Sequence, residues 1–221
     1  MTTPLGGTLG GAALQIRDAL ATAAERLAGS TVQVRGEAGR GRDGAGSGVI
    51  WRADGLVVTN AHVVGDARHL TVELTDGRRF RGEVIRLDPR CDLAAIRLAG
   101  AAGGAPLVAA ESASSQTLRV GQLVFALGHP WGVRNTMTTG IVHALPGATT
   151  GASGRAARRW LQADVRLAPG NSGGPLADAW GRVVGVNSMI VRGLAFAVPS
   201  DAVERFLGAS SLGGLGGAAA A

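Results

Sequence analysis

The chain has 221 residues, enough for one large domain or two small ones. Its Leu, Ile, Val and Phe residues make up about 24% of the chain, above the roughly 20% level below which disorder is expected, and its 36 Gly and 8 Pro follow no triplet period. A disordered chain and a collagen are therefore excluded. The net charge of +6 comes from a set of basic residues that are all arginine, so the high isoelectric point is weak support for nucleic-acid binding.

The sequence shows neither a disulfide framework nor an export signal. Cys91 is the single cysteine, so stability must come from packing. The first residues lack a basic and an apolar signal region, and the longest apolar uncharged run, 120–133, is too short to span a membrane. We therefore expect a cytoplasmic chain without a membrane span, a periplasmic or secreted location staying open if the sequence has been trimmed.

The apolar spacing changes once along the chain. Residues 11–28 carry apolar side chains three and four apart, which predicts an amphipathic helix, and from residue 31 the period becomes two. Twelve short β-branched runs follow, separated by Gly, Asp, Asn or Pro. The predicted strands are 31–35, 47–52, 56–60, 70–75, 79–88, 93–98, 122–127, 136–144, 160–165, 175–178, 183–189 and 194–199.

The strands fall into two groups of six with a linker at 99–118 that carries one charge. Short antiparallel strands without long helices between them favour two closed barrels or a sandwich. We expect barrel one at about 30–98, barrel two at 119–199, a closing helix at 200–207 and a flexible Gly/Ala tail at 208–221, after an N-terminal segment at 1–29.

Three segments carry residues suited to catalysis. Ser172 lies in a run of glycines before a strand, where backbone N–H groups can converge beside a hydroxyl. His62 follows an apolar strand at a short helical turn, and Asp92 precedes another strand. Taken singly, each has a plain structural reading: a turn serine, a core histidine and a turn aspartate.

Taken together, these residues supply a nucleophile, a general base and the carboxylate that orients the base. A serine hydroxyl is a poor nucleophile until a neutral imidazole takes its proton. His62 and Asp92 would come from the first barrel and Ser172 from the second, with the cleft between them.

Three blocks resemble the signature motifs of the HtrA/Deg family of trypsin-like serine proteases: Thr59-Asn-Ala-His62-Val-Val, Asp92-Leu-Ala and Gly170-Asn-Ser172-Gly-Gly-Pro-Leu. The resemblance covers roughly residues 30 to 207, with the blocks in the family's order. It implies an all-β fold of two six-stranded antiparallel barrels of the chymotrypsin type. It also implies a serine endopeptidase that cleaves unfolded or exposed protein segments through an acyl-enzyme.

The resemblance further implies the roles of single residues. Ser172 is the expected nucleophile, His62 the general acid and base, Asp92 its orienter, and the N–H groups of Gly170 and Ser172 the oxyanion donors. We expect no cofactor and no metal, and we read His129, where the family usually has Asn, as a loop variation.

The family often carries C-terminal PDZ domains, and we expect none here because only 14 residues follow Leu207. The expected partners are polypeptide substrates. Many relatives are trimers built through the segment before the first barrel, here the helix at 11–28, so a homotrimer stays open.

The pocket for the residue before the scissile bond is expected between the segment preceding Ser172 and the strand that follows it. The candidate lining residues are Leu167, Ala168, Asn187, Met189 and Ile190. They include no carboxylate, which predicts a preference for a small or medium aliphatic residue. Arg166 would favour acidic residues if it entered the pocket, but we expect it to point outward.

Two hypotheses from other classes stay open. The chain could be a catalytically silent, protease-fold module that holds peptides, with the triad misaligned. Nucleic-acid binding driven by the positive charge is the weakest of the three hypotheses, and we expect no nucleic-acid partner because the basic groups are short and separated.

Overall fold

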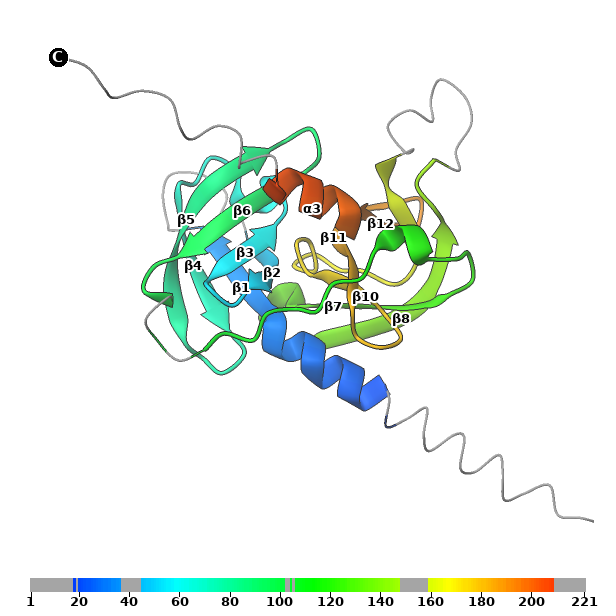
Figure 1. The fold of residues 1–221 in the computed structure, drawn as a ribbon, viewed down its shortest axis with the longest axis horizontal. Coiled ribbons are helices and arrows are strands. Elements are labelled where there is room, and N and C mark those ends of the chain that lie inside the picture. The colour runs from blue at the N-terminus through cyan, green and yellow to red at the C-terminus, as the bar shows by residue number, and fades with distance from the viewer. Residues whose placement is uncertain are drawn as a thin grey trace, which may run out of the picture.

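The computed structural model describes residues 18, 20–36, 45–101, 104, 106–147 and 159–208, apart from the side chain of Trp131. The predicted fold class is confirmed: two closed, six-stranded antiparallel barrels hold nearly all of the regular structure. Figure 1 shows the barrels side by side, with the last helix lying across the junction between them.

The first barrel runs β1-β2-β3-β6-β5-β4 and closes through the pairing of β1 with β4. Its strands are β1 (Thr31–Gly36), β2 (Ala45–Arg52), β3 (Leu56–Thr59), β4 (His69–Leu74), β5 (Arg79–Asp88) and β6 (Leu93–Leu98). Inward-facing β-branched side chains fill it, as the period of two predicts, and Val32, Ile50, Val72 and Ile96 are fully buried. A short helix, α2 (Ala61–Val64), follows β3.

The second barrel runs β10-β11-β12-β9-β8-β7 and closes through the pairing of β10 with β7. Its strands are β7 (Leu123–Gly128), β8 (Thr136–Ala144), β9 (Leu161–Asp164), β10 (Pro175–Asp178), β11 (Val183–Val191) and β12 (Leu194–Pro199). The observed strand ends lie within two residues of the predicted ones, and five of the twelve strands agree at both ends. The 3-10 turns η2 (Ser115–Thr117) and η3 (Pro130–Gly132) flank β7, and α3 (Ser200–Gly208) follows β12.

A separate apolar cluster joins the two barrels. Val49 and Val58 from the first barrel and Phe125 and Leu127 from the second are buried in one cluster. Phe206 of α3 completes the cluster. Burying a side chain of this size stabilises the fold by about 1.5–3 kcal/mol, so the relative placement of the barrels is set by packing.

The linker between the barrels bonds to both of them. The N–H of Ala110 donates to the carbonyl of Ile50 in β2, and the carbonyl of Glu111 accepts from the N–H of Val183 in β11. The segment 99–118, which we expected to act as a linker, therefore also holds the two barrels together at their junction.

The N-terminal helix is described at residue 18 and at 20–30, and residues 11–17 and 19 of the predicted helix lie outside the described residues. The helix extends to residue 30, two residues beyond the prediction. The hydroxyls of Ser30 and Thr31 both donate to the carbonyl of Leu27, and the Leu27 side chain is buried in the inter-barrel cluster. At the other end, Gly208 closes α3, and the predicted tail beyond it lies outside the described residues.

Gly140 tests how closely the strands of the second barrel pack. A Cβ built at Gly140 in β8 would lie 1.8 Å from the carbonyl oxygen of Asp164 in β9, a backbone atom that cannot move aside. We expect Gly140→Ala to lower the free energy of unfolding by about 1–3 kcal/mol or more, measured by urea denaturation. Gly208→Ala adds its methyl group to open space and should leave stability unchanged or slightly raised. Equal effects of the two substitutions would contradict the packing argument.

Candidate active site

His62 is presented to solvent by α2. The apolar residues of this short helix, Ala61, Val63 and Val64, are buried against the first barrel, which leaves His62 on the outward side. Gly65, with φ of +53°, ends the helix after its single turn. The His62 side chain is half exposed, at 50%. The sequence pattern therefore places an imidazole at the mouth of the barrel junction.

Asp92 faces this imidazole from the turn between β5 and β6. Nδ1 of His62 lies 2.9 Å from Oδ1 and 2.9 Å from Oδ2 of Asp92, and the backbone N–H of His62 donates to Oδ1 over 3.1 Å. Asn60 donates from Nδ2 to the carbonyl of Asp92 over 3.0 Å, which anchors the turn to the end of β3. Asp92 has φ of +53°, in the left-handed region that Asp tolerates better than most residues.

Ser172 lies on the second barrel, in the turn before β10, and its backbone is held to β2. The N–H of Ser47 donates to the carbonyl of Ser172 over 2.8 Å. The Ser172 hydroxyl donates to the carbonyl of Ser188 over 2.9 Å, rather than to His62. The Ser188 hydroxyl donates in turn to Oδ2 of Asp92. One residue of β11 thus connects Ser172 with Asp92.

Between Gly170 and Gly174, two backbone N–H groups have no partner among the described residues: those of Gly170 and Ser172. Their neighbours are paired, since Asn171 donates to Ala168, and Gly173 donates to Asn187 over 2.8 Å. Such a pattern provides a pair of donors for a developing negative charge.

A cavity of about 150 Å³ opens beside Ser172. Four of the five predicted pocket residues line it, together with Pro169, Ser172 and Ser188; the four are Leu167, Ala168, Met189 and Ile190. The side chain of Arg166 is exposed and does not line the cavity. The walls are therefore mainly apolar.

Asn187 is the predicted pocket residue that does not line this cavity. It is fully buried, and its Nδ2 donates to the carbonyl of Pro175 over 2.8 Å. Its backbone carbonyl accepts from Gly173, and its N–H donates to Gly174. β11 is irregular between Asn187 and Met189, so these two residues do not share a face as regular alternation would require: Asn187 points into the protein and supports the turn that carries Ser172, whereas Met189 lines the cavity.

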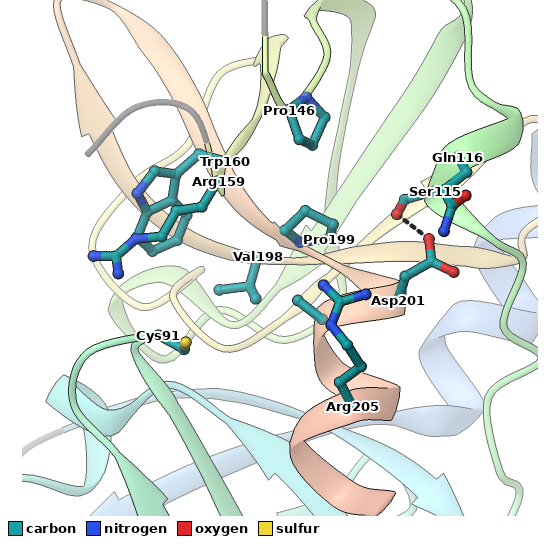
Figure 2. Close-up of a pocket in the computed structure, with 11 residues that line it drawn as sticks. Cys91, Ser115, Gln116, Pro146, Arg159, Trp160, Val198, Pro199, Asp201 and Arg205 are labelled. Carbon is teal, nitrogen blue, oxygen red and sulfur yellow. Dashed lines mark hydrogen bonds between the residues drawn. The ribbon is translucent and has the colours of Figure 1, made fainter. Parts of the chain in front are cut away.

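A larger cavity of about 350 Å³ lies beside Cys91, the residue before Asp92, and Figure 2 shows its lining. Trp160 and Arg159 stand on one side of it, and Ser115 with Asp201 on the other. Burial raises the pKa of the Cys91 thiol, and the carboxylate of Asp88 adds to this rise, so the thiol is protonated and weakly nucleophilic at neutral pH. None of the three predicted catalytic residues lines this cavity. The smaller cavity is the better candidate for substrate binding.

The electrostatics favour an ionised Asp92. Burial by itself would raise the pKa of this carboxyl group, but hydrogen bonds from His62 and Ser188 outweigh it, and the pKa lies below its usual value. His129 behaves differently, because burial lowers the pKa of its imidazole and keeps the ring neutral. Within the described ranges, no group of three or more His, Cys, Asp or Glu side chains could hold a metal ion.

Ser188 and Ser47 make hydrogen bonds to this site but were not among the predicted site residues. Both are buried serines within strands, β11 and β2. Ser47 stands between two glycines at the start of the apolar run Gly46-Ser-Gly-Val-Ile50, and a polar residue in that position was the available signal. Ser188 had no local signal.

Comparison with known proteins identifies the class. The family model of the trypsin-like peptidase domain matches residues 46–186. A probable periplasmic serine protease do/HhoA-like of Haemophilus influenzae is 39% identical over 174 residues, which are 76% of this chain and 36% of that protein. Mitochondrial serine protease HTRA2 of Bos taurus is 39% identical over 165 residues, 73% of this chain and 35% of that protein. Periplasmic serine endoprotease DegP of Escherichia coli is 40% identical over 166 residues, 72% and 34% respectively.

The chain belongs to the trypsin-like peptidase family, and its resemblance to the HtrA/Deg serine proteases is confirmed. It spans about a third of the length of the curated relatives that it matches.

The expected cytoplasmic location is wrong. Relatives whose names state a location are periplasmic or mitochondrial. Cys91 is the single cysteine and cannot close an intrachain disulfide, so cysteine usage could not indicate the compartment. In the part of the chain that is described, the helices are all too short or too polar to cross a membrane.

The Ser188→Ala variant tests whether the Ser188 hydroxyl stabilises the ionised form of Asp92, through the pH dependence of the free energy of unfolding. A hydrogen bond to a charged group contributes about 1.5–3 kcal/mol, and the variant should lose about this much stability at neutral pH. The pKa of Asp92 is lowered by folding, so this stabilisation is present above the unfolded-chain pKa of about 3.9 and is lost as the pH falls through the folded value. The stability difference between wild type and variant, measured by urea denaturation, should therefore shrink in acid.

In an Asp92→Asn background the effect of Ser188→Ala should be smaller and nearly independent of pH. A difference that stays constant from neutral pH to acid in the wild-type background would refute the assignment.

Proposed function

We propose that this protein is a serine endopeptidase that hydrolyses peptide bonds in unfolded or exposed protein segments, with Ser172, His62 and Asp92 as its catalytic triad. The observation that carries the proposal is the placement of both Asp92 oxygens at 2.9 Å from Nδ1 of His62, with Ser188 bonded both to Asp92 and to the Ser172 hydroxyl. The contact between Asp92 and Nδ1 directs the other ring nitrogen, Nε2, away from the carboxylate. An imidazole held in this way can accept a proton at Nε2.

The first chemical step is attack on the scissile carbonyl. The Ser172 hydroxyl rotates from the Ser188 carbonyl toward His62, and Nε2 takes its proton as the Oγ–carbon bond forms. The carbonyl π electrons move to the oxygen, which accepts hydrogen bonds from the unpaired N–H groups of Gly170 and Ser172.

The tetrahedral intermediate then collapses. The imidazolium of His62 returns its proton to the leaving nitrogen, the carbon–nitrogen bond breaks, and an acyl-enzyme on Ser172 remains. A water molecule repeats the sequence, with His62 as its base, and releases the acid and the serine. Throughout, ionised Asp92 stabilises the imidazolium without taking the proton itself.

A catalytically silent peptide-binding module is the second candidate. One observation favours it: the Ser172 hydroxyl donates to the Ser188 carbonyl and not to the imidazole. The two candidates differ in whether the hydroxyl can leave this carbonyl, and a reagent that reacts only with an activated serine separates them.

We expect a fluorophosphonate probe to modify the wild-type protein once per chain, at Ser172, as measured by intact-protein mass spectrometry. Ser172→Ala should prevent labelling. His62→Ala should slow both labelling and peptide hydrolysis by at least about 1000-fold, since it removes the base. His143→Ala is the matched control, because His143 is an exposed histidine on β8 away from the cleft, and it should label at the wild-type rate. Peptide binding without labelling at any pH would instead establish the silent module.

The apolar walls of the small cavity support a preference for a small or medium aliphatic residue before the scissile bond. Ala168, Met189 and Ile190 supply apolar surface, and no carboxylate or guanidinium lines the cavity. In a series of otherwise identical peptides, kcat/KM should be highest with Val or Ala at this position. Arg, Lys or Glu should lower it by about 10-fold or more, because their charge would be desolvated without a partner. Preferred cleavage after Glu would show that Arg166 reaches the cavity.

A further inference from the structure

We propose that Ser47 is a positioning residue for catalysis: its hydroxyl, on the first barrel, holds the oxyanion loop of the second barrel, which we define as residues 168–174. The inference rests on the proposed function and names a residue that sets the efficiency of the same site. Ser47 is fully buried in β2 and cannot touch a substrate. It acts through Gly170.

Ser47 makes four hydrogen bonds, and three of them cross between the barrels. Its hydroxyl donates to the carbonyl of Gly170 over 2.7 Å and accepts from the N–H of His129 over 3.0 Å. Its N–H donates to the carbonyl of Ser172 over 2.8 Å. The fourth bond lies within the first barrel, where the Thr59 hydroxyl donates to the Ser47 carbonyl over 2.6 Å. One residue therefore binds both peptide units that follow the two proposed oxyanion donors.

Ser47 fits between the two barrels only because several of the residues that surround it are glycines. A Cβ at Gly173 would lie 2.1 Å from the Ser47 carbonyl oxygen, and one at Gly128 would lie 2.9 Å from the Ser47 hydroxyl. A Cβ at Gly174 would lie 3.2 Å from the Ser47 Cβ. The oxyanion loop and the end of β7 can thus pack closely around Ser47 because glycines stand at the contact positions.

The hydroxyl matters because Gly170 has no side chain, and the peptide unit that follows it is held at two points: the Asn171 N–H donates to the Ala168 carbonyl over 3.0 Å, and the Gly170 carbonyl accepts from Ser47. Gly170 has φ of +104°, which L side chains rarely adopt, and a Cβ there would lie 2.7 Å from the His129 carbonyl oxygen. Without the Ser47 hydroxyl, this peptide unit would keep only the bond from the Asn171 N–H to the Ala168 carbonyl, and a glycine tolerates a wider range of torsions than other residues. The bond from Ser47 fixes the carbonyl of Gly170. It thereby restrains the φ and ψ angles of Gly170, which set the direction of the Gly170 N–H.

The consequence is a selective effect on turnover. When the hydroxyl is lost, the Gly170 N–H still exists but points into the cleft for a smaller fraction of the time. The ground-state peptide depends little on this donor, whereas the tetrahedral intermediate depends on it strongly. We therefore expect kcat to fall about 10- to 100-fold in Ser47→Ala, less than the 100- to 1000-fold typical of a lost donor, while KM stays within about twofold.

Ser200→Ala is the matched control. Ser200 is also a buried serine, and its hydroxyl donates to the Ala113 carbonyl over 2.7 Å and accepts from the Ser115 N–H over 3.1 Å. These two bonds match those of the Ser47 hydroxyl in kind and length, but they lie at the start of α3. Ser200→Ala should lower stability by about as much as Ser47→Ala and leave kcat unchanged.

A second readout does not depend on activity. Gly-Asn occurs once in the sequence, at Gly170-Asn171, so a sample with ¹³C-carbonyl glycine and ¹⁵N-asparagine gives one NMR signal that reports the Gly170 carbonyl. We expect Ser47→Ala to move this carbonyl resonance upfield, as loss of a donated hydrogen bond does. Ser200→Ala should leave it in place.

The outcomes separate the two proposals. A wild-type protein that neither labels nor cleaves peptides refutes the protease function. A Gly170 carbonyl resonance that is the same in wild type and Ser47→Ala overturns the role of Ser47, whatever the activity. So does an active wild type whose kcat is unchanged by Ser47→Ala or is lowered equally by Ser200→Ala. A shifted carbonyl with a selective loss of kcat supports the inference.

Discussion

The site depends on how the two barrels pack against each other. His62 and Asp92 belong to the first barrel and Ser172 to the second, so their distances are set by the apolar cluster around Val49 and Phe125. Packing of this kind is stiff, because interiors are as dense as organic crystals and transmit small displacements. The placement of three polar side chains is thus determined by side chains that take no part in the chemistry.

Packing alone leaves the loops undetermined, and hydrogen bonds across the junction fix them. Buried Glu73 of β4 pairs with Arg79 within the first barrel and with Arg134 of the loop between β7 and β8 in the second. Around Ser172 the crossing bonds come from Ser47, a neutral residue. The serine can serve in the dry interior because its donor and acceptor are both satisfied there, whereas a buried charge would need a partner to offset its desolvation.

The sequence predicted features that depend on local patterns. The strands followed from alternation, as in β1, and the chemical residues followed from short motifs around His62 and Ser172. Asn187 was placed in the pocket because it is near Met189 in sequence, but β11 is irregular between the two residues and Asn187 is turned inward. The contacts of Ser188 and Ser47 join residues about 100 positions apart, and no local pattern reports such pairings. The location was mispredicted because it was inferred from the lack of a signal region in the first residues, and the packed domain itself carries no pattern that could correct this inference.

The oxyanion loop shows how a protein can keep donors available without losing order. A buried backbone N–H normally finds a partner, and leaving one unpaired costs free energy. Here the N–H groups of Asn171, Gly173 and Gly174 are paired, while those of Gly170 and Ser172, which alternate with them, have no partner among the described residues. The carbonyls of Gly170 and Ser172 are bound to Ser47. Bonds to Ser47, Ala168 and Asn187 therefore order the loop, while the two N–H groups that the proposed chemistry would use have no partner among the described residues, so the loop needs no rearrangement before they donate.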